Sequence, residues 1–215
     1  MNRLELGLYI ITESRTGFER DHLDMASAAL EGGADVLQLR DKGLGGREMM
    51  GLTLRMRELI ESGGNRCLMV INDRLDVAVA AEADGVHLGQ QDLPAKAARS
   101  VAGDKMIIGI SASTVEEAER AQDDGADYLG VGPVYPTPTK LDAGLPIGVE
   151  GIRRIKEVVE IPIVAIGGIG PENLERVMEA GADGVAVISA ISAAADMLEA
   201  VRQLRRAVDA CFSGR

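Results

Sequence analysis

Three polar side chains alternate with two leucines at the expected end of a buried strand. Gln38, Arg40 and Lys42 stand two positions apart, with Leu37 before Gln38 and Leu39 between Gln38 and Arg40. Because side chains alternate between the two faces of a strand, the polar three share one face. Two cations on one face are unfavourable unless an anion lies opposite, and the arginine fork matches phosphate oxygens. This strand end predicts an anion site; a solvated charged loop is the alternative.

Two carboxylates follow the next two apolar runs of the chain. Asp73 comes after Asn72 at the end of one run, and Asp92 follows the run that contains His87 and Leu88. If these runs are neighbouring strands, Asp73 and Asp92 approach each other and bind Mg²⁺ together with substrate phosphates. For an isolated pair, a helix cap would be the better interpretation of Asn72 and Asp73. His87 has the opposite parity from Leu88 and is expected to pack or hydrogen-bond inside the fold, not to ligate metal.

Hydroxyl groups follow two later runs. Ser111 is expected to face the same mouth as the acids, whereas Ser113 and Thr114 are expected to cap a helix. Prolines on both sides of Thr137 stiffen a loop that also presents Thr139 and Lys140, which predicts a second phosphate-contacting loop.

Glycines and small residues end the last two runs. Gly168 follows one of them, and Ile188 and Ser189 end the other. Glycine lets an oxyanion reach backbone N–H groups, so these ends are predicted to bind a second phosphate through neutral donors. Tight packing of strand on helix is the alternative.

Eight apolar runs alternate with helical patterns and position these residues. The phrase Gly-Ala-Asp, or Ala-Asp-Gly, recurs around Asp35, Asp84, Asp127 and Asp183, each time between a helical pattern and an apolar run. Four such returns indicate four βαβ quarters, in which glycine forms the left-handed cap of a helix. A doubly wound open sheet lacks support, since no Gly-rich turn follows the first run. We therefore expect residues 1–215 to form a single (β/α)8 TIM barrel with its chemistry at the carboxyl ends of the strands.

The strand and helix ranges follow from this alternation. Thr114 and Pro171 stand where two helices are expected to begin. The expected strands are residues 6–12, 36–40, 67–73, 85–89, 106–112, 128–134, 162–168 and 184–189, and the expected helices are residues 22–32, 47–62, 75–83, 94–102, 115–124, 149–159, 172–180 and 194–208.

Composition narrows the class of protein. The chain has 215 residues, of which 46% are hydrophobic, and a formal net charge of -11, so nucleic acid and anionic membranes are not expected partners. Two distant cysteines form no metal or disulfide pattern, and no apolar run reaches the length of a membrane span. We expect a cytoplasmic protein that acts on small molecules. Its oligomeric state is open, and a homo-oligomer is compatible with the sequence.

Taken together, these motifs resemble the thiamine phosphate synthase family. The resemblance runs from Leu8 to Ile191 and rests on Gln-Leu-Arg-x-Lys, Ile-Asn-Asp-Arg, His-Leu-Gly-Gln-x-Asp and Gly-Pro-x-Tyr-Pro-Thr-x-Thr-Lys. It implies a transferase that joins hydroxymethylpyrimidine diphosphate to hydroxyethylthiazole phosphate and releases pyrophosphate. The reaction is expected to be dissociative and assisted by Mg²⁺.

The resemblance also implies roles for individual residues. The pyrimidine diphosphate would be held by Gln38, Arg40, Lys42, Asn72, Ser111 and Lys140, and Mg²⁺ by Asp73 and Asp92; of these, Arg40, Lys42, Ser111 and Lys140 would be catalytic. The thiazole phosphate would lie against Thr137, Thr139, Gly168, Ile188 and Ser189. The family usually has a histidine where this chain has Ser113, so any role of that histidine does not carry over.

Three other functions compete with this one. A thiazole tautomerase on the same scaffold would need a proton-transfer residue and no acidic pair. A non-catalytic barrel could sense a phosphorylated metabolite. A Schiff-base aldolase would need a lysine inside a strand, and Lys42 and Lys140 both fall at loop positions.

Overall fold

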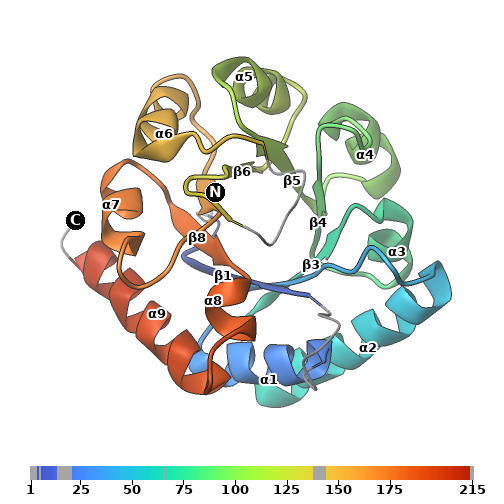
Figure 1. Ribbon diagram of the computed structural model, residues 1–215. Coiled ribbons are helices and arrows are strands. Elements are labelled where there is room, and N and C mark those ends of the chain that lie inside the picture. The colour runs from blue at the N-terminus through green and yellow to red at the C-terminus, as the bar shows by residue number, and fades with distance from the viewer. Residues whose placement is uncertain (1–3, 5, 14–20, 65, 138–143, 214–215) are drawn as a thin grey trace.

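The computed structural model describes residues 4, 6–13, 21–64, 66–137 and 144–213 and confirms the predicted (β/α)8 barrel. Each strand pairs in parallel with the next along the chain, and the last pairs with the first (Figure 1). The strands are β1 (Leu8–Thr12), β2 (Val36–Leu39), β3 (Leu68–Asn72), β4 (Gly85–Leu88), β5 (Ile107–Ala112), β6 (Tyr128–Val131), β7 (Ile163–Ile166) and β8 (Gly184–Val187).

A ring of helices surrounds this barrel. They are α1 (His22–Gly32), α2 (Gly46–Gly63), α3 (Leu75–Ala80), α4 (Ala95–Ala102), α5 (Val115–Asp123), α6 (Gly148–Lys156), α7 (Leu174–Glu179), α8 (Ser189–Ser192) and α9 (Met197–Ser213). Along the described chain no helix is both long and apolar enough to cross a bilayer.

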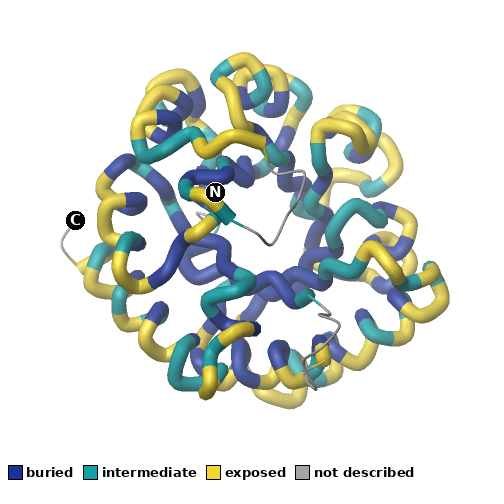
Figure 2. Tube along the Cα trace, viewed as in Figure 1, coloured by how far each residue is buried: buried dark blue, intermediate teal, exposed yellow. Residues whose placement is uncertain are grey.

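Apolar side chains form two layers, one inside the barrel and one between the strands and the helices. Tyr9 and Ile11 point into the barrel, whereas Leu8 and Ile10 pack under the helices. The strands are buried on both sides, and the helices expose only their outer faces (Figure 2). This is the pattern expected of a parallel sheet that is covered by its crossover helices.

The helices agree with the expectation in number and order only in part, and several of their bounds differ, such as α3, which ends at Ala80, and α9, which spans Met197–Ser213. Thr114 does cap α5, accepting a hydrogen bond from the Glu117 amide. Pro171, however, does not begin a helix: α7 starts at Leu174, because the Asn173 side chain first holds the preceding turn by accepting from the Gly170 amide. The short helix α8 was not predicted, and it follows directly on the end of β8.

The repeated glycine does form left-handed caps, but in three quarters only. Gly33, Gly125 and Gly181 have φ values of 88°, 86° and 108°. In the remaining quarter Gly85 lies inside β4, and Glu82 takes the left-handed position with φ 52°. Thus the repeat there differs from the expectation.

The aspartates of the repeat have a structural role at the amino ends of the strands. Each accepts a hydrogen bond from a backbone N–H at the start of an odd-numbered strand, where the ladder leaves an amide donor without a strand partner. The pairs are Leu8 N to Asp35 at 2.7 Å, Met69 N to Asp84 at 2.7 Å, Ile108 N to Asp127 at 2.7 Å and Ile163 N to Asp183 at 3.0 Å. These bonds tie each quarter to the preceding strand.

Removing one of these carboxylates should therefore lower stability without changing the site. Asp183 also pairs with Lys156 at 2.9 Å, so Asp183→Ala leaves both Lys156 and the Ile163 amide without this acceptor. We expect a loss of about 1–3 kcal/mol in the free energy of unfolding, measured by urea denaturation. Glu179→Ala, an exposed carboxylate on α7, is the control and should change stability by less than about 0.5 kcal/mol. Equal effects of the two substitutions would contradict this role.

Candidate active site

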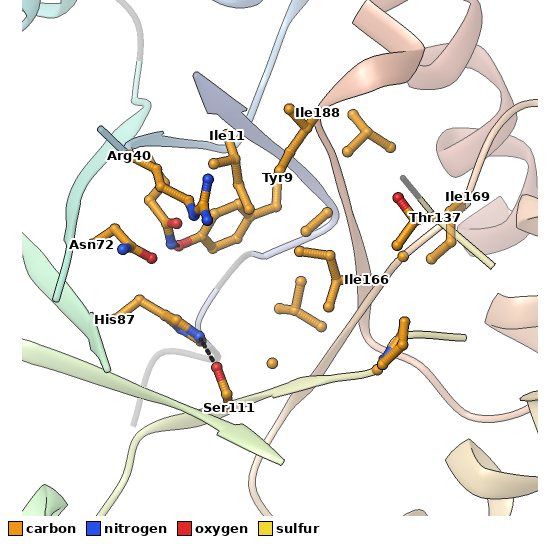
Figure 3. A pocket seen from close by; sticks show the side chains of 18 of the residues that line it. Tyr9, Ile11, Arg40, Asn72, His87, Ser111, Thr137, Ile166, Ile169 and Ile188 are labelled. Atoms are coloured by element: carbon orange, nitrogen blue, oxygen red, sulfur yellow. Dashed lines mark hydrogen bonds between the residues drawn. The ribbon is translucent and has the colours of Figure 1, made fainter. Parts of the chain in front are cut away.

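A pocket opens at the carboxyl ends of the strands and contains most of the predicted site residues. Its polar wall comes from β2 to β5, and its apolar wall includes Ile11, Val164, Ile166 and Ala186 from β1, β7 and β8 (Figure 3). The predicted residues that line it are Gln38, Arg40, Lys42, Asn72, Asp73, Ser111, Thr137, Gly168, Ile188 and Ser189. Thr139 and Lys140 lie outside the described residues.

The β2 end carries its polar side chains as the alternation predicts. Gln38, Arg40 and Lys42 line the pocket, while Leu37 and Leu39 pack under the helices. One partner was not foreseen: Arg40 Nη1 donates to Glu13 Oε1 at 2.7 Å, and both side chains are largely buried. Glu13 follows β1, which pairs in parallel with β2 with Thr12 opposite Leu39, so Glu13 and Arg40 leave the two strands side by side. The Arg40 charge is therefore balanced within the protein.

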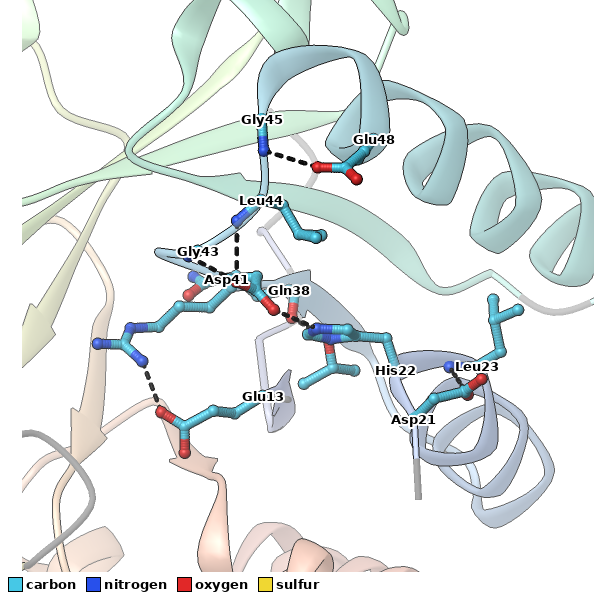
Figure 4. A network of polar contacts seen from close by, with 12 residues as sticks. Glu13, Asp21, His22, Leu23, Gln38, Asp41, Gly43, Leu44, Gly45 and Glu48 are labelled. Atoms are coloured by element: carbon cyan, nitrogen blue, oxygen red, sulfur yellow. Dashed lines mark hydrogen bonds and ion pairs between the residues drawn. The ribbon is translucent and has the colours of Figure 1, made fainter. Parts of the chain in front are cut away.

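The loop that carries Lys42 is folded around Asp41 (Figure 4). The Asp41 carboxylate accepts from the amides of Gly43 at 2.7 Å and Leu44 at 3.2 Å, and it contacts His22 Nε2 at 3.1 Å. Burial acts to raise the pKa of Asp41, but the bonds from His22 and these amides outweigh it and lower the pKa. Asp41 thus remains an anion that fixes this loop to the start of α1.

Asp73 and Asp92 lie together, as expected from the neighbouring ends of β3 and β4. The Asp73 amide donates to the His87 carbonyl oxygen at 2.8 Å, and the residue has a φ of 62°. Burial, the nearby Asp92 charge and a hydrogen bond with Asp92 raise the pKa of Asp73, although Lys42 and Arg40 act to lower it. Two carboxyl groups this close repel each other when both are ionised, so the pair favours a shared proton or a cation.

These two acids fit Mg²⁺ better than a softer metal. Within the described ranges no group of three or more His, Cys, Asp or Glu side chains is placed to hold an ion. Zinc usually takes three or four protein ligands, whereas Mg²⁺ uses one or two carboxylates and fills its remaining positions with water and substrate phosphates. The acidic pair beside Arg40 and Lys42 supplies that incomplete set.

A chain of polar side chains crosses the barrel below the pocket opening. Gln38 Nε2 donates to the Tyr9 hydroxyl at 2.7 Å, and that hydroxyl lies 2.9 Å from the Tyr128 hydroxyl. His87 then bridges Tyr128 at 3.0 Å and Ser111 at 3.0 Å. The prediction that His87 hydrogen-bonds inside the fold is confirmed.

The two tyrosines were missed by the sequence reasoning. Burial is the main cause that raises the pKa of both hydroxyls, so Tyr9 and Tyr128 stay neutral. Their signal was present in the sequence: the chain has three tyrosines, and these two occupy inward positions of expected strands.

Of the hydroxyl groups after β5, those of Ser111 and Thr114 take the expected places, whereas Ser113 does not cap the helix. Ser111 lines the pocket, whereas Thr114 caps α5 and the Ser113 hydroxyl donates to Glu117 at 2.9 Å. Gln90 steadies the strand end, because its Nε2 donates to the Ser111 carbonyl oxygen at 2.6 Å.

The β7 end needs glycine for both conformation and space. Gly167 and Gly168 have φ values of 102° and 64°, and a Cβ on Gly168 would lie 2.8 Å from Tyr135 Cβ and 2.8 Å from the Pro136 carbonyl oxygen. Asn173 Nδ2 donates to the Gly168 carbonyl oxygen at 2.9 Å and holds this turn. The backbone here approaches the pocket without a side chain in between.

Comparison with known proteins identifies the family of the chain. The model of the family described as thiamine monophosphate synthase matches residues 8–191. The chain is 51% identical to the thiamine-phosphate synthase of Moorella thermoacetica, over 94% of this chain and 95% of that protein. It is 48% identical to the thiamine-phosphate synthase of Archaeoglobus fulgidus over the full length of both. A solved structure of thiamine phosphate pyrophosphorylase from Pyrococcus furiosus superposes with a TM-score of 0.88, at 43% identity and 98% coverage of each chain.

Proposed function

The chain belongs to the thiamine monophosphate synthase family, and from this premise we propose how its pocket carries out the reaction. The family condenses a pyrimidine and a thiazole moiety into thiamine phosphate, and the chain is an enzyme of this kind. The substrates that we propose are hydroxymethylpyrimidine diphosphate and hydroxyethylthiazole phosphate, with pyrophosphate as the second product. The acidic net charge and the absence of a disulfide between Cys67 and Cys211 support a cytoplasmic location.

The polar wall of the pocket would bind the pyrimidine diphosphate. Arg40 and Lys42 supply positive charge, and Asn72 and Ser111 supply neutral donors on the same side. Gln38 lies deeper and is almost fully buried, which suits an amide that reads ring atoms more than phosphate oxygens. Lys140 is assigned to this group by its motif alone.

The opposite rim would bind the thiazole phosphate. Thr137 lines it, together with Gly168 and Ser189, and the motif adds Thr139. Ile188 extends the apolar wall formed by β7, β8 and β1. Neutral donors on one rim would hold the thiazole phosphate, and cations on the other rim would hold the pyrimidine diphosphate. The thiazole and pyrimidine rings would then face each other between the two rims.

The proposed binding site for the diphosphate also includes the two acids that fit a metal ion. Asp73 and Asp92 would hold Mg²⁺ beside the diphosphate oxygens. The bound ion would supply positive charge to the oxygens of the leaving group, a contribution of several kcal/mol in comparable sites.

Bond cleavage would precede bond formation in this pocket. The carbon–oxygen bond breaks with both electrons leaving on pyrophosphate, and the aminopyrimidine ring stabilises the resulting cation. The thiazole nitrogen then donates its electron pair to that carbon. Arg40, Lys42 and Lys140 would stabilise the charge that grows on the departing pyrophosphate, and no side-chain nucleophile is required.

One observation carries this proposal: Arg40, Lys42 and Asp73 line one pocket, and Asp92 lies beside Asp73. Purified protein should release pyrophosphate only when both substrates and Mg²⁺ are present. Release without the thiazole substrate would contradict condensation. Binding of either phosphate without turnover would favour a metabolite sensor.

Metal removal gives a second test. EDTA should stop turnover, and excess Mg²⁺ should restore it, because the acidic pair cannot itself neutralise a leaving diphosphate. The measurement is the rate of pyrophosphate release before and after each addition. Pyrophosphate release that persists in EDTA would contradict the proposed metal site. Isomerisation of a thiazole without any pyrophosphate release would favour a thiazole tautomerase.

A further inference from the structure

The hydrogen-bonded chain below the pocket joins five side chains from five strands. It runs from Gln38 on β2 through Tyr9 on β1, Tyr128 on β6 and His87 on β4 to Ser111 on β5. Every step is 2.7–3.0 Å long, the range of a well-formed hydrogen bond. Figure 3 shows the last step, from His87 to Ser111.

The donors and acceptors available to these side chains fix the direction in which the hydrogen bonds are donated along the series. The Tyr9 oxygen accepts from Gln38, and Tyr9 is 1% exposed, so its own O–H needs an acceptor inside the protein. Tyr128 provides that acceptor. The Tyr128 O–H is then free to donate to His87 Nδ1, which leaves the imidazole proton on Nε2.

The direction decides what Ser111 can do. His87 Nε2–H donates to Ser111 Oγ, so the serine oxygen is an acceptor in the chain and its own hydrogen is left for the pocket. If the Gln38 amide were flipped, every hydrogen bond in the series would run the other way, and the Ser111 hydroxyl would donate its hydrogen to His87 Nε2. Only the first direction offers an anion a donor, since phosphate oxygens accept hydrogen bonds and do not donate them.

Two glycines make room for the rings of this chain. A Cβ on Gly109 would collide with the Tyr128 ring, and a Cβ on Gly130 would lie 2.7 Å from His87 Cε1. The two rings lie side by side with centroids 5.5 Å apart. The absence of a side chain at Gly109 on β5 and at Gly130 on β6 thus leaves the space that the two rings occupy.

We propose that Tyr128 and His87 are positioning residues that keep the Ser111 hydroxyl oriented as a hydrogen-bond donor to the phosphoryl group bound above it. This inference rests on the proposed function, because it takes the ligand to be a diphosphate. Neither ring has to touch the substrate to act in this way. Loss of the Tyr128 hydroxyl removes the donor that holds His87 Nδ1 unprotonated, so the Ser111 hydrogen can turn to His87.

The tautomer of His87 can be measured without substrate. The chain has two histidines, so ¹⁵N-histidine labelling gives two imidazole spin systems, and His22→Gln assigns them. We expect the wild-type His87 proton on Nε2 and a loss of this preference in Tyr128→Phe. A proton on Nδ1, or on both nitrogens, in the wild-type protein would overturn the proposed direction. So would an unchanged tautomer in Tyr128→Phe.

Kinetics then tests the consequence for catalysis. Ser111→Ala should lower kcat by about 100-fold, as loss of one preorganised donor does in other sites. Tyr128→Phe should lower kcat by no more than this, with little change in KM. The double variant should match Ser111→Ala alone, because both changes remove one interaction. Effects that multiply in the double variant would mean independent roles and would overturn the inference.

A matched control comes from the third tyrosine. Among the described residues the Tyr135 hydroxyl is buried without a hydrogen-bond partner. Tyr135→Phe therefore removes a tyrosine hydroxyl from the protein but leaves the hydrogen bonds from Gln38 to Ser111 in place. Its kcat and the His87 tautomer should equal those of the wild type. If the wild-type protein shows no turnover with both substrates, the proposed function fails, and the tautomer measurement still decides the direction of the hydrogen bonds.

Discussion

Asp92→Ala should abolish turnover and leave the fold intact. Asp92 would provide one of two protein ligands to Mg²⁺, and its loss leaves Asp73 alone on the metal-binding side. Loss of several kcal/mol of stabilisation of the leaving group corresponds to a fall in kcat of about 10²- to 10³-fold or more. The rate of pyrophosphate release at saturating Mg²⁺ measures it.

The fold should survive because Asp92 is exposed and its carboxylate makes one backbone contact, accepting from the Gly89 amide at 2.7 Å. We expect the free energy of unfolding to change by about 1 kcal/mol at most. Asp104→Ala, an exposed carboxylate in the loop between α4 and β5, is the control and should retain full activity. If Asp92→Ala is as active as this control, the proposed metal site is wrong.

The barrel and the polar face of β2 were predictable because both follow from short-range patterns of apolar and polar residues in the sequence. Alternation with period two places Gln38, Arg40 and Lys42 on one face wherever the strand lies. The meeting of Asp73 and Asp92 needed one further rule, that consecutive strands of such a barrel are neighbours. These steps require no knowledge of which atom faces which across the sheet.

The contacts that depend on register could not be predicted. Arg40 meets Glu13, and Tyr9 meets Tyr128 across the barrel, through positions that no local pattern connects. The aspartate repeat shows the same limit. Its glycines were recognised as helix caps, whereas the carboxylates act on strands that lie earlier in the chain, which only the closed structure reveals.

Asp73→Asn should separate function from stability. In the metal-free protein burial and Asp92 raise the pKa of Asp73, so ionising this group at neutral pH is less favourable in the folded state than in the unfolded chain. The folded protein therefore binds more protons than the unfolded chain between the ordinary aspartate pKa and the raised one. Stability then falls as the pH rises through this interval. Asparagine removes the titration and the repulsion, and it tolerates the left-handed φ of 62°.

We therefore expect metal-free Asp73→Asn to melt at the same temperature as the wild type or higher at neutral pH, with the difference shrinking as the pH falls. Turnover should drop by about 10²- to 10³-fold, and Mg²⁺ should raise the melting temperature of the wild type but not of the variant. Asp73→Ala is the comparison: it also removes the charge but places a less tolerant residue at positive φ, so it should melt lower than Asp73→Asn. A metal-free Asp73→Asn protein that melts well below the wild type at neutral pH would show that the two acids do not repel each other. In that case they would be held by cations of the protein itself, and the need for a bound metal would lose its physical basis.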